Sequence, residues 1–260
     1  MNSIFSTLHS AAEKSHKLHI LYKVSRYIYI TCLPVIMCML LSACSKEPKT
    51  PVQLVEGTGT EGNNSIYAVV DVQDYGRMKF RLLKDQAPEA VEAFSRLAGE
   101  GYYDQKPVYM LIKDYCMISG SESDAAYSVS DDATLNSACY PLRGALCFTR
   151  SEGVGKYSCS DFTVIQTSSE FLSKLEELLE YKKVTPGEYF KQAYGNDIDE
   201  DSLSIFKKYG GAPWLYGHCI VFGQLTEGEE VLDRICSVEV YDDSQFKPME
   251  DIIINCINIE

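Results

Sequence analysis

Short apolar or alternating runs separated by turn residues predict a mainly β-protein. Ile66 to Val72 and Met78 to Leu83 flank Asp74-Tyr75-Gly76, a pattern typical of a hairpin with a tight turn. Val108 to Gly120 predicts a further pair of strands. Ile252 to Ile259 alternates and predicts a last strand that closes the sheet. The dominant period is therefore that of strands.

The most informative stretch lies near the middle of the chain. Arg143 to Arg150 and Ser160 to Gln166 are short and rich in β-branched and aromatic residues, as expected of neighbouring strands. The polar loop Ser151 to Cys159 separates them. Before this hairpin, Ser121 to Ala138 is acidic and has no period, which predicts a long surface loop.

Helical spacing predicts four helices between these strands. Pro88 suits the first turn of a helix that ends at Gly99 and Gly101. Three more are expected between residues 168 and 211. Their starting signals and ends are Thr167-Ser168-Ser169-Glu170, Thr185-Pro186-Gly187-Glu188 with Gly195, and Asp199 to Tyr209 closed by Gly210-Gly211. Their apolar faces favour packing on the barrel over binding a partner.

The first 65 residues indicate export and tethering. Residues 1–43 form a basic segment followed by an apolar run that is short for a membrane span, which predicts a signal peptide. Leu41-Ser42-Ala43-Cys44 resembles the bacterial lipobox, so Cys44 is the expected site of lipid attachment. A plain secretory signal or a short anchor is the alternative. Residues 44–65 predict a flexible tether before a domain at 66–260. We therefore expect a lipid-anchored, extracytoplasmic protein of the bacterial cell envelope.

Composition excludes several other functions. The chain of 260 residues carries a formal net charge of −13, and residues 44–260 alone carry 20 basic and 36 acidic side chains, a net −16. Such a charge argues against nucleic acid as a partner. Beyond residue 43 the only histidine is His218, and no C-x-x-C pair occurs, so we expect neither a metal site nor a Ser/His/Asp triad. Disulfide pairing stays open.

Five segments in order resemble one family. They are Asp85-Gln86-Ala87-Pro88, Gly101-Tyr102-Tyr103, Arg143-Gly144-Ala145-Leu146, Ser160-Asp161-Phe162-Thr163-Val164 and Trp214-Leu215-Tyr216-Gly217-His218-Cys219-Ile220-Val221-Phe222-Gly223. Together they resemble the cyclophilin-type peptidyl-prolyl cis-trans isomerases over about residues 66 to 259. The resemblance implies a closed eight-stranded antiparallel β-barrel capped by two helices, the second at Glu229 to Ile235. It makes residues 168 to 211 a helical insertion.

The resemblance also implies a peptide-binding groove. Matched position by position, its residues are Tyr109, Met110, Tyr115, Ile118 or Ser119, Thr149, Arg150, Asp161, Thr163, Trp214, Leu215 and Cys219. Met110 stands where active members of the family have their catalytic arginine, whichever way the following residues are aligned. Ile118 replaces a glutamine and Thr163 a phenylalanine. A thioether donates no hydrogen bond, so no residue is expected with confidence to be catalytic.

Two functions remain open from the sequence. One is a prolyl isomerase of weak activity, in which another cation replaces the arginine; the candidates are Arg77, Arg81, Arg143, Arg150 and Lys113. The other is a catalytically inactive cyclophilin-like protein that binds peptides or acts as a chaperone. In either case the expected partners are proline-containing segments or envelope proteins, and the membrane through the lipid anchor. No cofactor is expected.

Overall fold

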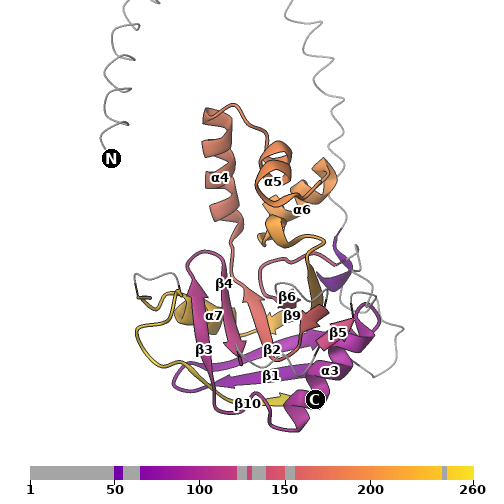
Figure 1. Ribbon diagram of the computed structural model, residues 1–260, viewed down its shortest axis with the longest axis vertical. Helices are drawn as coiled ribbons and strands as arrows, with labels where there is room; N and C mark the ends of the chain where they lie inside the picture. Colours follow the sequence, from indigo (N-terminus) through magenta and orange to yellow (C-terminus); the bar gives the residue numbers. More distant parts are fainter. Residues whose placement is uncertain (1–49, 55–64, 122–127, 131–138, 150–155, 242–244) are drawn as a thin grey trace, which may run out of the picture. The chain divides into compact units, whose positions relative to one another are not determined.

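The protein is described by a computed structural model that covers residues 50–54, 65–121, 128–130, 139–149, 156–241 and 245–260 (Figure 1). The expected signal peptide at 1–43, the lipid-attachment residue Cys44, the groove candidate Arg150 and most of the tether at 44–65 lie outside these ranges. Within the described ranges, no helix combines the length and apolar character that a membrane crossing requires.

Eight antiparallel strands close into a barrel, in the spatial order β1-β10-β3-β4-β8-β6-β9-β2. Their bounds are β1 Tyr67–Val72, β2 Gly76–Leu82, β3 Lys106–Ile112, β4 Cys116–Gly120, β6 Ala145–Thr149, β8 Asp161–Ile165, β9 Cys219–Glu227 and β10 Ile253–Ile259. Closure leaves no free sheet edge, because every strand has a neighbour on both sides. The fold expected from the sequence is confirmed.

Aromatic side chains fill the barrel, and two helices cover it. Phe148 and Phe222 face each other across β6 and β9 with ring centroids 4.2 Å apart. Phe94 of helix α3 (Pro88–Gly99) enters the same core and lies 5.0 Å from the ring of Phe222. Helix α7 (Glu229–Cys236) adds buried aliphatic side chains to this core. The apolar faces of the two helices thus join the inward-facing strand residues in one core.

The three helices of the insertion stand together on one side of the barrel (Figure 1). They are α4 Ser169–Tyr181, α5 Pro186–Tyr194 and α6 Glu200–Tyr209. The ends of α5 follow the sequence signals: Thr185 and Glu188 form a complete capping box, and Gly195 ends α5 in the left-handed conformation. Helix α4 begins one residue later than a capping box of Thr167 and Glu170 would place it, because its cap is Ser168, which accepts a 3.1 Å hydrogen bond from the backbone N–H of Phe171. Asp199 caps α6 by accepting a hydrogen bond from the backbone N–H of Ser202. Local capping chemistry therefore sets the boundaries of these helices.

The structure differs from the sequence expectation in two segments, the loop before the central hairpin and the tether. The expected surface loop Ser121 to Ala138 contributes β5 (Ser128–Ser130), which pairs with β7 (Lys156–Ser158) in a separate two-stranded sheet. The side chains of Val129 and Tyr157 from this ribbon are buried in the main core. Burial of these two apolar side chains attaches the ribbon to the core, which composition does not reveal.

The expected tether also contains an ordered turn. Val52–Leu54 forms the short 3-10 helix η5, and Gln53 is 1% exposed. The amide of Gln53 donates to the backbone oxygen of Tyr140 (2.5 Å) and accepts from its backbone nitrogen (2.7 Å). Its amide also donates to Gln224 of β9 (3.1 Å). Because a buried amide needs its hydrogen bonds, this glutamine fixes the turn to the barrel.

Candidate functional site

Five predicted groove positions lie on the outer face of strands β3, β4, β8, β6 and β9: Met110, Ile118, Thr163, Thr149 and Cys219. Met110 pairs with Ile118, Ile118 with Thr163, and Thr163 with Cys147. Residues directly opposite one another in an antiparallel pair point to the same face, so these four side chains form one row across the sheet. The row contains no cation and no amide. The alternate residues on β4, β8 and β6 point into the barrel core.

An apolar cluster lies under and beside this row. Its buried members are Leu83, Cys116, Cys139, Ala145, Cys147, Ile165, Ala212, Cys219 and Val221. Five half-buried side chains pack against it: Ile112, Tyr115, Ile118, Trp214 and Leu215. The structure therefore brings Tyr115, Ile118, Trp214, Leu215 and Cys219 together, as expected. Thr149 pairs with Cys219 at the rim of the same face and is partly exposed.

A bulge in β3 places two consecutive side chains near this face. The register shifts between Val108 and Met110, so that Tyr109 is the extra residue of the bulge. The Tyr109 hydroxyl donates a 2.7 Å hydrogen bond to Oδ2 of Asp161 on β8. Asp161 pairs with Gly120 of β4, whose φ is +127° and where a Cβ would lie 2.4 Å from the backbone oxygen of Ser160. Only glycine fits there, so that β4 can approach β8 closely at Asp161.

Ser119, the alternative to Ile118, lies on the other side of β4. It pairs with the core residue Phe162, is fully buried, and its hydroxyl donates a 3.0 Å hydrogen bond to the backbone oxygen of Pro107. The outer face at this point is therefore formed by Ile118. The position at which active members of the family have a glutamine is therefore apolar in this chain.

Trp214 stands at one side of the apolar cluster on the 3-10 turn η6 (Pro213–Leu215). Its ring meets that of Tyr115 edge to face, with centroids 5.1 Å apart and an interplanar angle of 72°. Burial raises the pKa of Tyr115 well above its ordinary value, although a hydrogen bond with Trp214 acts in the opposite direction. The two aromatic groove residues thus form a contact pair in a poorly solvated place.

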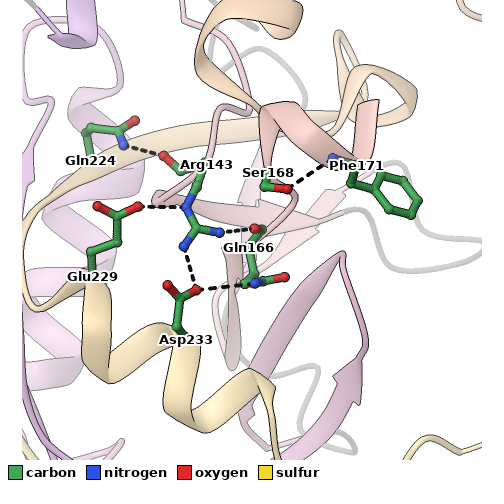
Figure 2. Close-up of polar contacts among 7 residues, drawn as sticks. All are labelled: Arg143, Gln166, Ser168, Phe171, Gln224, Glu229 and Asp233. Carbon is green, nitrogen blue, oxygen red and sulfur yellow. Dashed lines mark hydrogen bonds and ion pairs between the residues drawn. The ribbon is translucent and has the colours of Figure 1, made fainter. Parts of the chain in front are cut away.

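The guanidinium of Arg143 is bound to other groups of the protein and does not serve as a donor in the groove (Figure 2). Its guanidinium bonds to Glu229 (2.7 Å) and Asp233 (2.5 Å) of α7 and to the backbone oxygen of Gln166. Gln224 of β9 donates to its backbone oxygen at 2.8 Å. Burial disfavours the charged guanidinium, but the bonds to the two carboxylates outweigh this and raise its pKa. Arg143 therefore joins β6 to α7.

Three further candidate cations, Arg77, Arg81 and Lys113, are also placed elsewhere, while Arg150 lies outside the residues that the structure describes. On β2, Arg77 pairs with Asp71 (2.7 Å), and Arg81 donates to the backbone oxygen of Gln53 (2.5 Å). Strands β1 and β10 separate β2 from β3 in the barrel. Lys113 follows β3 and borders a hollow that Arg143 and α7 also line. Among the described residues, none of the candidate guanidinium groups is therefore placed beside Met110.

One cation that the sequence did not put forward borders Met110. A hollow of about 500 Å³ lies beside β3 and is lined by Tyr109, Met110, Lys247 and Glu250 among others. The backbone N–H of Leu111 donates to the oxygen of Phe246 (2.9 Å) and so holds this segment against β3. Lys247 is exposed on a stretch without helix or strand. Spacing alone did not indicate that this lysine lies across the hollow from Met110.

The thiols under the groove are not activated for chemistry. Burial raises the pKa of the Cys147 thiol, which contacts the thiol of Cys219, and it raises the pKa of Cys116 in the same cluster. It raises the pKa of Cys139 to about 11. A nucleophilic or metal-binding cysteine needs its thiolate form, which burial disfavours here. Within the described residues, no three or more His, Cys, Asp or Glu side chains are grouped to hold a metal ion.

Comparison with known proteins identifies the family. The family model described as "Cyclophilin type peptidyl-prolyl cis-trans isomerase/CLD" matches residues 67–258. A Staphylococcus haemolyticus protein named "Putative peptidyl-prolyl cis-trans isomerase" is 31% identical over 192 residues, covering 71% of this chain and 87% of its own. A Staphylococcus aureus (strain USA300) protein of the same name is 30% identical over 193 residues, with the same coverages.

A solved structure agrees with the fold. The crystal structure of a cyclophilin-type peptidyl-prolyl cis-trans isomerase from Cryptosporidium parvum superimposes with a TM-score of 0.51. It is 20% identical and covers 76% of this chain and 98% of its own, a likeness that concerns the fold alone. By the family model and the bacterial relatives, this chain belongs to the cyclophilin-type peptidyl-prolyl cis-trans isomerase family.

Proposed function

We propose that this protein binds proline-containing peptide segments in the outer-face groove and isomerises their X-Pro bonds weakly. The observation that carries the proposal is the row Met110, Ile118 and Thr163, which keeps the apolar groove floor but lacks a charged donor. Trp214, Leu215 and Tyr115 remain to hold an apolar ring. Binding and catalysis therefore separate: Trp214, Leu215 and Tyr115 still offer contacts to a proline ring, although Thr163 replaces a phenylalanine, while Met110 provides no donor to stabilise the twisted bond.

The chemistry explains why one donor matters. Rotation about a peptide bond faces a barrier of about 18–20 kcal/mol, because twisting ends the amide resonance. A catalyst has to favour the twisted state over both planar states. In active members of the family, a guanidinium donates to the proline nitrogen as it becomes pyramidal. By analogy with the removal of an oxyanion-hole donor, its loss costs about 2.7–4 kcal/mol, or roughly 10²- to 10³-fold in rate.

Among the described residues, Lys247 is the cation best placed to supply residual activity. It lines the same hollow as Met110, and its ammonium group carries three N–H donors. An exposed lysine on an irregular segment is less pre-organised than a guanidinium held on a strand, which is consistent with weak rather than full catalysis.

A coupled isomerisation assay on an Ala-Pro peptide tests this function. At micromolar protein, we expect a small rate above background that falls further in Lys247→Ala. The matched control is Lys84→Ala, which removes an exposed lysine before α3. A rate indistinguishable from background in the wild type, together with peptide binding, would favour the second candidate, a catalytically inactive peptide-binding or chaperone protein. The replacement of the arginine by Met110 is the observation that supports this second candidate.

We also propose that the protein acts at the bacterial cell envelope as a lipoprotein anchored through Cys44. The support is the sequence alone: an apolar leader followed by Leu41-Ser42-Ala43-Cys44. Acyl chains contribute about 0.8 kcal/mol per buried methylene, so two or more chains anchor stably. Growth with labelled palmitate should label the wild type and not Cys44→Ala, and the variant should leave the membrane fraction. Equal labelling of both would exclude Cys44 as the attachment site.

A further inference from the structure

A buried amide from the insertion reaches the turn that carries Trp214. Asn196, directly after the end of α5, is 3% exposed. Its Nδ2 donates to the backbone oxygen of Trp214 at 2.7 Å, of Pro213 at 3.2 Å and of Tyr216 at 3.3 Å. Carbonyl oxygens only accept hydrogen bonds, so the amide nitrogen has to face them. One side chain of the insertion thus holds three backbone carbonyl groups, those of Pro213, Trp214 and Tyr216, in the turn that carries the groove tryptophan.

Two rings of α5 contact the ring of Trp214 as well. Phe190, which is 2% exposed, lies 6.4 Å from it at an interplanar angle of 35°. Tyr194 lies 6.2 Å from it at 32°. Both separations fall within the range of favourable aromatic pairs. The rings differ in their exposure, because Phe190 is buried while 47% of Tyr194 remains open to solvent.

These contacts join the groove to the insertion in one aromatic strip, formed by Tyr115, Trp214, Tyr194 and Tyr189. Successive ring centroids are 5.1 Å, 6.2 Å and 6.2 Å apart. The strip begins at a groove position next to β4 and ends on α5. A peptide that lies along the groove and continues past Trp214 would next meet the open ring of Tyr194.

A purely structural role explains only part of this arrangement. Helices that merely cover the barrel need buried side chains such as Phe190, and they do not need an amide donated to the backbone of a groove residue. They also gain little from a half-exposed tyrosine beside the tryptophan. Rigid aromatic side chains with one open face are, in contrast, well suited to contact a ligand at low conformational cost.

We propose that the helical insertion is part of the peptide-binding site: Asn196 and Phe190 position Trp214, and Tyr194 recognises an aromatic side chain near the bound proline. The inference rests on the proposed function, since it concerns the same groove. It assigns the substrate class as proline-containing segments with a neighbouring aromatic residue.

The first test uses Trp214 as its own reporter, because it is the only tryptophan of the chain. In the purified full-length protein without peptide, Asn196→Ala and Tyr194→Ala should shift the tryptophan emission to longer wavelength and increase its quenching by acrylamide. Tyr181→Ala is the matched control, because this tyrosine of α4 is 83% exposed. Far-ultraviolet circular dichroism verifies that each variant is folded. Unchanged emission in both variants would overturn the proposal.

The second test measures affinity by titrating Trp214 fluorescence with three peptides, Phe-Ala-Pro-Ala, Ala-Ala-Pro-Phe and Ala-Ala-Pro-Ala. One phenylalanine peptide should bind roughly 2- to 10-fold more tightly than the alanine peptide, as expected for one aromatic pair. Tyr194→Ala should abolish this preference, whereas Tyr194→Phe and Tyr181→Ala should keep it. Binding of all three peptides with equal affinity would overturn this inference and leave the proposed function standing. Absence of binding by every peptide would overturn the proposed function itself.

Discussion

If the proposed function holds, replacing Met110 by arginine should raise the isomerase activity. Met110 occupies the first position of the outer-face row and is only partly buried. The hollow of about 500 Å³ beside it offers room for a longer side chain, so the variant should avoid the usual cost of overpacking. A donor at this point is worth about 2.7–4 kcal/mol of barrier lowering, which predicts a rise of roughly 10²- to 10³-fold in kcat/KM.

The assay is protease-coupled isomerisation of an Ala-Pro peptide, with affinity measured separately through Trp214 fluorescence. Met110→Leu is the matched control, since it preserves volume but adds no donor, and its rate should equal that of the wild type. Met110→Arg should raise kcat/KM mainly through kcat, because the donor acts on the twisted state. If folded Met110→Arg binds the peptide but turns it over no faster than Met110→Leu, the reasoning about the missing donor is wrong.

Three further predictions concern stability, each measured by urea unfolding. Gly120→Ala should lower the free energy of unfolding by about 2–4 kcal/mol, because the new Cβ would lie 2.4 Å from the oxygen of Ser160 at a positive φ. The control Gly99→Ala has open space around it and should lose nothing. Equal losses in the two variants would refute the steric argument. Burial raises the pKa of Cys139 from 9.0 to about 11, so the native state favours the neutral thiol. The free energy of unfolding should therefore keep this contribution below pH 9 and fall by about 1–3 kcal/mol between pH 9 and 11. In Cys139→Ala the fall over this pH range should be less steep. Thr185→Ala should cost about 1 kcal/mol by removing the capping box of α5, and an unchanged midpoint would show that the box contributes nothing.

Much of the fold could be predicted because its signals are local. The hairpin around Asp74-Tyr75-Gly76 and the helix starting at Pro88 depend on turn and capping residues that neighbour each other in sequence. The same holds for α5 and α6, whose caps at Thr185 and Asp199 lie where the sequence indicated. The ribbon of β5 and β7 was missed, because two three-residue strands in polar surroundings carry no period long enough to detect.

The site could be predicted only in part, because its geometry depends on long-range contacts. Alternation along β4 could have favoured Ile118 over Ser119, but the choice needed the register of β4 against β8. The roles of Lys247 and Asn196 depend on segments that are distant in sequence and meet in space. An asparagine after a helix-ending glycine is typical of a turn, so Asn196 gave no sign that its amide reaches the backbone of Trp214.

The central claim is that this groove still holds proline peptides but lacks the donor that speeds their isomerisation. Two-dimensional exchange NMR of the wild-type protein with an Ala-Pro peptide tests it most directly, since one sample reports both binding and cis/trans exchange. We predict peptide shifts that change on adding protein, with exchange that is slow and about 10²- to 10³-fold faster with Met110→Arg. Exchange in the wild type as fast as in Met110→Arg would contradict the claim.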